Sequence, residues 1–225
     1  MKRKVKTKVK GFRTTDGAGV KLVRVLGNLT TKEFDPILML DSFDSINPDD
    51  YTAGFPMHPH RGIETISYVS RGKMVHRDSL GNEAGISDGE VQWMNSGSGI
   101  MHEEMVPAAE RLLGVQLWLN LPAKDKMSKP SYNSIKNEDI KEIEIEGGKI
   151  RLLAGKYGEH EGYKGDYLSM DYYDIHLNAD AEVTLTMEED DSVMVFTLLG
   201  DVYIDGEHIE EKNSRQINGR RQSYN

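Results

Sequence analysis

Residues 55–105 read FPMHPHRGIETISYVSRGKMVHRDSLGNEAGISDGEVQWMNSGSGIMHEEM and contain four of the seven histidines of the chain. His58 and His60 lie two residues apart among strand-forming residues, and so do His102 and Glu104. Residues two apart in an extended chain project to the same face of a sheet. Each pair is therefore predicted to direct two ligating side chains to a common point, where the four form one metal site.

Three neutral imidazoles and one carboxylate suit a divalent transition metal. Such nitrogen-rich ligands favour iron, nickel, copper, cobalt, manganese or zinc over calcium and magnesium. Four protein ligands around a six-coordinate ion leave about two positions for oxygen, water or substrate. Alternation favours Glu104 over Glu103 as the ligand, because Glu104 shares a face with His102. The direction of His76 stays open from its spacing.

Short apolar runs alternate with glycine and asparagine turns, which is typical of an all-β sandwich or barrel. We expect strands within residues 20–27, 36–43, 64–72, 73–82, 89–97 and 113–122. Pro59 cannot donate a hydrogen bond to a sheet ladder, so the strand around His58 and His60 is predicted to lie at an edge or a bulge. Helical patterning is scarce.

The prolines and charges of residues 121–130 interrupt the strand pattern and indicate a linker. We predict an N-terminal metal-binding domain over residues 1–125 and a second β domain over residues 126–225. Residues 193–206 share an outline with residues 65–81: an apolar strand, a glycine turn at Gly200 or Gly72, and a second strand. This weak similarity suggests that a barrel was duplicated and that the second copy has no metal ligands.

Composition excludes several functions. The net charge of −9 argues against direct binding to a nucleic-acid backbone. The absence of cysteine excludes disulfides, thiolate metal sites and a cysteine nucleophile. The basic segment MKRKVKTKVK has no apolar stretch after it, so we expect no membrane association and a cytoplasmic location. Its alternation instead predicts a strand with a solvated lysine face.

The central stretch resembles the pirin family of the cupin superfamily. The resemblance rests on HPHRG from His58, HRDSLGN from His76, GEVQWM from Gly89 and HEEM from His102, and it extends over roughly residues 20–125. It implies a bicupin fold of two stacked antiparallel β-barrels of the jelly-roll type. It also implies a metal in the N-terminal barrel, held by residues His58, His60, His102 and Glu104, with Fe(II) as the first expectation.

Residues around the ligands have predicted supporting roles. Glu64, Asp78 and Glu103 are candidates to orient the ligating histidines, because such histidines usually donate their other ring nitrogen to a carboxylate or carbonyl. Glu104 is the candidate catalytic base, with Glu64 and Glu103 as alternatives. An apolar wall beside the metal is predicted from residues Phe55, Met57, Trp93, Met94 and Met101, although core packing explains these residues equally well.

The resemblance implies two functions of different classes. Some members of the family are dioxygenases that open the heterocyclic ring of the flavonol quercetin with O2 and release carbon monoxide. In animals, relatives are nuclear proteins that bind transcription regulators, and the oxidation state of their iron alters the protein surface. A flavonol and O2 are thus the expected substrates in the first case, and a protein partner is expected in the second.

The C-terminus departs from the pattern of the family. After Glu211 the chain continues as KNSRQINGRRQSYN, which is polar, locally basic and without alternation. We therefore expect the second barrel to be truncated relative to the family and incomplete. An open sheet edge would be a liability, which predicts either a homodimer through the C-terminal half or reduced stability.

Overall fold

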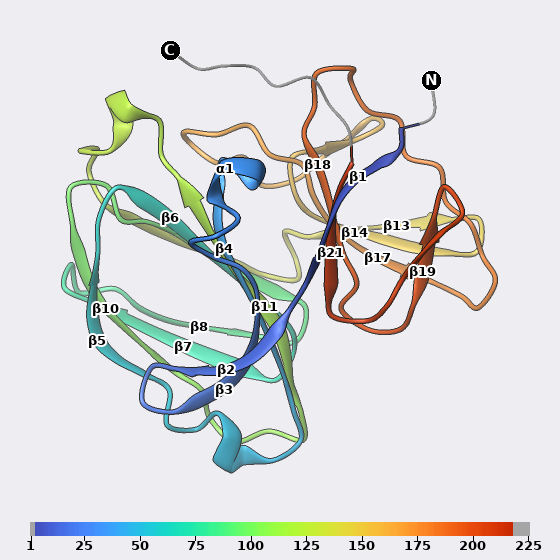
Figure 1. Cartoon of the computed structure of the whole chain (residues 1–225). Helices are drawn as coiled ribbons and strands as arrows, with labels where there is room; N and C mark the ends of the chain where they lie inside the picture. The colour runs from blue at the N-terminus through green and yellow to red at the C-terminus, as the bar shows by residue number, and fades with distance from the viewer. Residues whose placement is uncertain (1–2, 218–225) are drawn as a thin grey trace.

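A computed structural model describes residues 3–217 and shows a protein built almost entirely of β-strands. Its sheets form two units side by side, one mostly from the blue to green part of the chain and one from the yellow to red part together with the dark blue strand β1 (Figure 1). The short helix α1 spans Thr31–Phe34, and single 3-10 turns occur at Pro48–Asp50 and Ala123–Asp125. Within residues 3–217 no helix has the length and apolar character needed to cross a membrane.

The N-terminal unit consists of a seven-stranded and a four-stranded antiparallel sheet. The larger sheet has the order β12-β9-β6-β11-β4-β3-β2. Its strands are β2 (Phe12–Asp16), β3 (Val20–Leu26), β4 (Ile37–Ser45), β6 (Ile63–Arg71), β9 (Glu90–Asn95), β11 (Leu112–Asn120) and β12 (Ser131–Ile135). The smaller sheet has the order β5-β10-β7-β8, with β5 (Phe55–His60), β7 (Lys73–Asp78), β8 (Glu83–Ser87) and β10 (Ile100–Met105). Strand β5 is an edge strand, as Pro59 predicted.

The C-terminal unit consists of smaller sheets. One has the order β1-β21-β18 and another the order β13-β14-β17. Their strands are β1 (Val5–Lys10), β13 (Lys141–Ile145), β14 (Gly148–Ala154), β17 (Tyr172–Leu177), β18 (Val193–Phe196) and β21 (Asn213–Ile217). Two hairpins complete it: β15 (Lys156–Tyr157) with β16 (His160–Glu161), and β19 (Val202–Ile204) with β20 (Glu207–Ile209).

The two faces of the seven-stranded sheet have different chemistry. On β6, Ile66 and Tyr68 belong to the main apolar core, which also contains Trp93, Leu117 and residues of the C-terminal unit such as Leu153. The alternate positions of the same strands point into the N-terminal barrel, toward the four-stranded sheet. The large sheet is therefore shared: one face closes the barrel that contains the histidines, and the other packs on the second unit.

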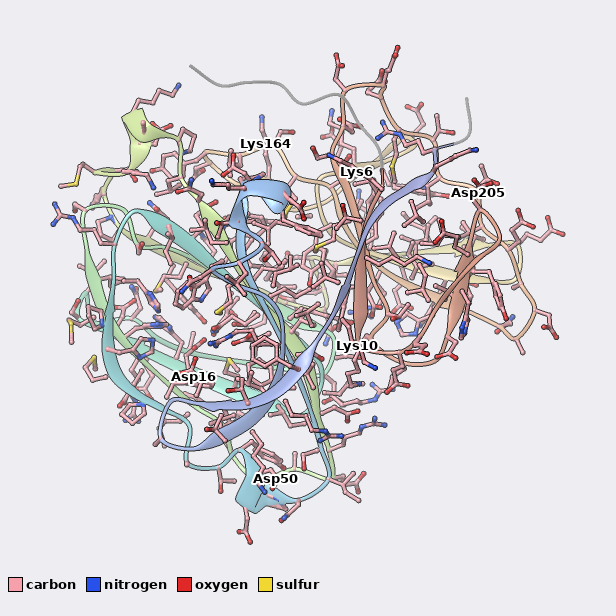
Figure 2. All side chains as sticks on the ribbon, viewed as in Figure 1. Lys6, Lys10, Asp16, Asp50, Lys164 and Asp205 are labelled. Carbon is pink, nitrogen blue, oxygen red and sulfur yellow. The ribbon has the colours of Figure 1, made fainter. Side chains whose placement is uncertain are left out.

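Each unit contributes a strand to the other. β12 follows the predicted linker, yet it pairs with β9 in the N-terminal sheet. β1 comes first in the chain, yet it pairs with β21. Its residues alternate between half-buried and exposed, with Lys6, Lys8 and Lys10 exposed, which confirms the strand with a lysine face (Figure 2). A domain boundary at residue 125 stays a prediction.

The loss of hydrophobic alternation after Glu211 does not prevent a strand, and an incomplete second barrel stays a prediction. Residues Asn213–Ile217 form β21, which lies between β1 and β18 and pairs with both. Two antiparallel neighbours can stabilise a polar segment that shows no hydrophobic alternation, because the ladder bonds are made by the backbone. The rest of the divergent tail, residues 218–225, lies outside the described residues. Dimerisation through this half also stays a prediction.

Candidate metal centre

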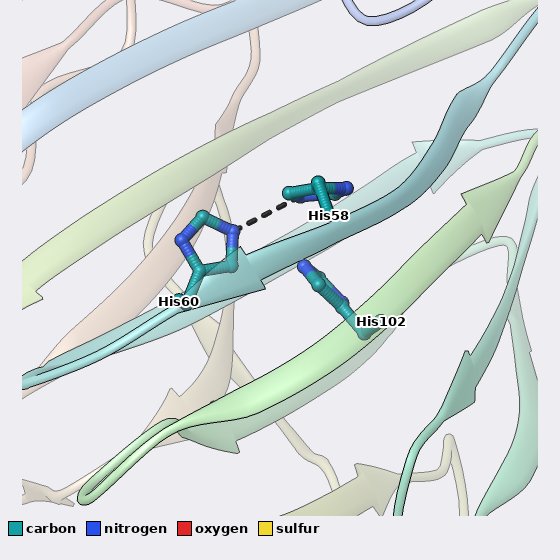
Figure 3. Close-up of side chains that lie close together, drawn as sticks. All are labelled: His58, His60 and His102. Carbon is teal, nitrogen blue, oxygen red and sulfur yellow. Dashed lines mark hydrogen bonds between the residues drawn. The ribbon is translucent and has the colours of Figure 1, made fainter.

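Three of the four predicted ligands lie together on the edge strand β5 of the four-stranded sheet and on its neighbour β10. His58 and His60 come from β5 and His102 from β10, where His102 is the cross-strand partner of His58 (Figure 3). One ring nitrogen from each histidine lies within 4.8 Å of the others. The sequence spacing therefore located this cluster correctly, and the antiparallel pairing of β5 with β10 supplies the contact between its two parts.

The separation of the nitrogens fits a shared metal ion. His58 Nε2 lies 3.0 Å from His60 Nε2. Two imidazole nitrogens bound at right angles to one ion, each at about 2.0–2.1 Å, are about 3 Å apart. His58 Nδ1 lies 2.8 Å from the carbonyl oxygen of Pro56, which can only accept a hydrogen bond. Nδ1 therefore carries the proton, and the lone pair of Nε2 is free for a metal.

His102 offers an unused nitrogen in the same cluster. Its side chain is buried, and its Nε2 has no hydrogen-bond partner among residues 3–217. A buried polar atom without a hydrogen-bond partner destabilises the fold unless a water molecule or a bound ion interacts with it. A metal ion shared with His58 and His60 would do so. The donor set therefore fits a divalent transition metal.

Burial keeps two of these imidazoles neutral. The pKa of His60 is lowered to about 4, chiefly by burial and further by the neighbouring His102 and His58. The pKa of His102 is lowered to about 3, again by burial first and then by His58 and His76. Neutral imidazole is the form that binds a metal, because protonation occupies the lone pair. The fold thus presents both rings ready to bind near neutral pH.

Glu104 is buried beside this cluster but is not part of it. Its carboxylate accepts hydrogen bonds from the amides of Gln92 and Gln116, the latter at 2.9 Å to Oε2 and 3.1 Å to Oε1. Ser67 lies 3.4 Å away and also donates. Gln92, Ser67 and Gln116 are direct cross-strand neighbours on β9, β6 and β11. One row of the large sheet therefore holds Glu104 from across the barrel.

A change of register separates Glu104 from the histidines. Between His102 and Glu104 the pairing of β10 with β5 shifts, so that Glu104 is paired with Phe55. Simple alternation in both strands would have paired it with Pro56. Such an irregularity redirects side chains locally. Glu104 as a ligand therefore stays a prediction, and the shift and the amide contacts depend on other strands.

The three carboxylates predicted to orient the ligating histidines, those of Asp78, Glu103 and Glu64, lie in different parts of the N-terminal unit. Asp78 accepts a hydrogen bond from His76, which in turn contacts His102. Glu103 lies on the opposite face of β10 from His102, with a carboxylate oxygen 3.6 Å from Arg77. Glu64 accepts a hydrogen bond from Trp93 Nε1 at 3.0 Å, on the sheet face that packs against the second unit. Of these three carboxylates, only that of Asp78 lies near the histidine cluster.

The predicted apolar wall is not assembled at the cluster. Met57 and Met101 are exposed, and each directly precedes a histidine of its strand, so its side chain points to the opposite face of the sheet. Trp93 belongs to the core between the two units, and Phe55 belongs to a separate core with Phe43 and Met74. Only Met94 shares a sheet face with Gln92, toward the barrel interior.

Two aromatic residues at the site were not expected from the sequence. The ring of Trp118 meets that of His60 edge-on, with centroids 4.9 Å apart. Tyr132 stacks on His76 with centroids 4.0 Å apart and planes 14° from parallel. Trp118 lies two residues after Gln116 on β11, so alternation from Gln116 would have found it. Tyr132 lies on β12, beyond the predicted domain boundary, and no local signal indicated it.

Comparison with known proteins agrees with this architecture. The family model described as Pirin matches residues 19–119. A Pseudomonas aeruginosa protein named "Putative quercetin 2,3-dioxygenase" is 42% identical over 88% of this chain and 72% of its own length. Human pirin is 33% identical over 93% of this chain and 71% of its own length.

A solved structure shows the same fold over nearly the whole chain. The crystal structure of a quercetin 2,3-dioxygenase from Acinetobacter baumannii matches with a TM-score of 0.86 and 28% identity. The match covers 97% of this chain and 80% of that one. The fold is accordingly the all-β bicupin expected from the sequence. The histidine cluster, the sheet order and these relatives together show that the chain belongs to the pirin family.

Proposed function

We propose that this protein is a mononuclear metal-dependent dioxygenase that cleaves a flavonol such as quercetin with O2. The observation that carries the proposal is the convergence of three imidazole nitrogens within 4.8 Å of one another, beside a buried carboxylate. The names of the Pseudomonas and Acinetobacter relatives support the same reaction class. Fe(II) is the metal that we propose first, as the resemblance to pirins implies, although the donor set itself suits nickel, copper, cobalt, manganese and zinc as well.

His58, His60 and His102 would hold the metal, and Glu104 is the fourth proposed ligand. When bound, the ion would act as a Lewis acid that lowers the pKa of the flavonol 3-hydroxyl. The three neutral histidines would add no charge to the site, whereas Glu104 as a ligand would add one negative charge. Trp118, edge-on to His60, offers an aromatic surface on which a planar flavonol can rest.

Glu104 is the proposed base. Its carboxylate accepts hydrogen bonds from Gln92, Ser67 and Gln116 in the interior of the barrel. A general base must be within hydrogen-bond reach of the proton that it accepts, and these hydrogen bonds fix the position of the carboxylate. The same amides can then remain bound to the protonated acid through its second oxygen. The base would therefore stay in place while a proton is transferred.

The test combines metal analysis with oxygen uptake. Purified protein loaded with Fe(II) should consume O2 and quercetin together, and the rate should follow its metal content. His58→Ala removes a half-exposed ligand and should weaken metal binding by more than about 100-fold, because loss of a mere outer partner already costs about 10–100-fold. Oxygen uptake should disappear with the metal.

His160→Ala is the matched control, because His160 is an exposed histidine on the β15–β16 hairpin of the other unit. This variant should retain both the metal and the activity. Metal-loaded wild-type protein that is inert toward a panel of flavonols would rule out the proposed reaction. A role through a protein partner would then be the next hypothesis to test.

A further inference from the structure

A line of hydrogen bonds runs from Asp78 through His76 to His102. His76 Nε2 lies 2.9 Å from Asp78 Oδ2, and His76 Nδ1 lies 3.3 Å from His102 Nδ1. The His76 side chain and the Asp78 side chain are both completely buried. His76 is therefore no surface residue, and it has a defined partner at each ring nitrogen.

The direction of these hydrogen bonds follows from Asp78, since an ionised carboxylate can only accept. In its neutral form His76 then carries its single proton on Nε2, which leaves a lone pair on Nδ1. That lone pair accepts from Nδ1 of His102, and Nε2 of His102 consequently carries no proton. This is the same Nε2 that is buried without a hydrogen-bond partner among the described residues.

We infer that Asp78 and His76 are positioning residues that fix the tautomer of His102, so that its Nε2 is bare and aimed at the metal. The inference rests on the metal site proposed above. It assigns His76 a position behind the ligand His102, which His76 contacts without binding the metal itself. In metal sites a ligating histidine commonly donates its other N–H directly to a carboxylate. Here a second imidazole is placed between the carboxylate and the ligand.

The surroundings hold both members of the pair in place. Asp78 Oδ1 accepts from the backbone N–H groups of Leu80 and Asn82, at 2.9 and 3.1 Å. Its Oδ2 also accepts from the Asn82 side-chain amide at 2.8 Å. The stacked ring of Tyr132 fixes the plane of His76. The turn after β7 thus saturates the carboxylate, and β12 orients the ring between it and His102.

Asp78→Asn provides a sharp test because it keeps the shape of the side chain and replaces the acceptor Oδ2, which faces His76 Nε2 and the Asn82 amide, with an NH2 donor. The single carbonyl oxygen of asparagine is needed by the two backbone N–H groups of the turn, so its NH2 group faces His76 Nε2. His76 must then carry its proton on Nδ1 and donate to His102. His102 in turn carries its proton on Nε2, where the metal should bind. One substitution is expected to invert two imidazole tautomers in series.

The measurement uses two-bond proton–nitrogen correlation spectra of the metal-free full chain, which distinguish the two tautomers of an assigned histidine. Wild-type His102 should show the Nδ1–H form and His76 the Nε2–H form, and Asp78→Asn should exchange both. The affinity for Zn²⁺, which has no redox chemistry, should fall by about 10–100-fold. Circular dichroism and a thermal melt establish that the variant is folded.

Asp201→Asn is the matched control. Asp201 likewise accepts from a histidine, His208 Nε2 at 3.0 Å, and from a backbone N–H, that of Glu211 at 2.9 Å. It lies on the surface of the C-terminal unit and should leave both Zn²⁺ affinity and the His102 tautomer unchanged.

Two results would overturn the inference: a wild-type His102 with its proton on Nε2, or an Asp78→Asn variant that binds Zn²⁺ as tightly as the wild type. The wild-type spectrum decides the matter even if the variant fails to fold. Failure of the proposed dioxygenase function is distinguishable, because Zn²⁺ binding and tautomers are measured without turnover. A protein that shows both inversions but never consumes a flavonol keeps the positioning role and loses the reaction.

Discussion

His60 and His102 couple the acidity of the solution to the stability of the metal-free fold. Their pKa values are lowered to about 4 and about 3 in the folded protein, chiefly by burial. An unfolded histidine has a pKa of about 6.5, so below that pH the unfolded chain binds more protons than the native one. Stability contributed by these neutral rings is complete above about pH 6.5 and is lost as the pH falls toward the folded values.

We therefore expect the free energy of unfolding of metal-free protein to fall by an amount on the order of a few kcal/mol between about pH 6.5 and 4. Urea denaturation at a series of pH values measures this dependence. The double variant His60→Gln/His102→Gln cannot titrate at these positions and should show a flatter profile. Equal pH profiles for the two proteins would contradict the assignment.

Residue types and spacing located the three histidines, because two-residue periodicity belongs to each strand alone. The same reasoning could not place Glu64, which lies on the face of β6 opposite Ser67 and contacts Trp93. Both faces of β6 are buried. Its sequence therefore does not indicate which face turns toward the metal site, because that depends on the neighbouring strands. Asp78 was expected near a ligand, but the interposed His76 depends on β10 pairing with β7.

At the scale of the elements, β11 is constrained at its centre by the strand beside it. A Cβ added to Gly114 would lie 2.4 Å from the carbonyl oxygen of Tyr68 on β6 and 3.3 Å from Val69 Cα. Both are backbone atoms of the shared sheet, so they cannot move aside alone. At Gly85 in β8, a Cβ would meet no atom closer than 3.5 Å. The two strand glycines therefore offer a matched comparison.

Gly114→Ala should lower the free energy of unfolding by about 1–3 kcal/mol, the usual cost of overpacking. Gly85→Ala should be neutral or stabilising by up to about 1 kcal/mol, because it restricts the unfolded chain without a clash. Urea denaturation followed by circular dichroism compares the two. If both substitutions changed the free energy of unfolding equally, the close approach of β6 to Gly114 would not be the cause of the destabilisation.

The strands themselves were predictable where alternation and turn residues agree, as for the runs that became β3, β6 and β9. β21 was missed because its stability comes from backbone pairing with β1 and β18, which leaves no hydrophobic pattern to detect. Conversely, residues 181–187 alternate in sequence but form no strand. Pairing between distant segments, which a local pattern does not encode, decides both cases.

At the scale of the whole molecule, a partly buried polar contact joins the two units. The Tyr68 hydroxyl on β6 donates to Asp174 Oδ2 on β17, and the same oxygen accepts from His176 Nε2 at 2.7 Å. These hydrogen bonds hold the pKa of Asp174 below its usual range although burial opposes this shift. Tyr68 also meets Tyr172 edge-on, with ring centroids 6.5 Å apart. The contact therefore lies beside the apolar core shared by both units, to which Tyr68 belongs and against which Tyr172 packs.

Tyr68→Phe should reduce the free energy of unfolding by about 1.5–3 kcal/mol, because it removes a hydrogen bond to a partly buried charged carboxylate. Unfolding should remain a single transition, since the two units share one core and exchange strands. Tyr203→Phe, at a tyrosine that is 73% exposed, is the control and should change stability little. A Tyr68→Phe variant as stable as the wild type would show that the contact contributes nothing to the joining of the units.

The pairing of β1 with β21 has a consequence for the timing of synthesis. Lys10 pairs with Asn213, so β1 leaves the ribosome long before its partner is made. At the usual rate of about 5–20 residues per second, the delay is about 10–40 seconds. During that time the strand has no neighbour, and an unpaired edge is exposed to other nascent chains. The lysines that alternate along β1 repel such partners, so the charged face keeps the strand available until translation reaches residue 217.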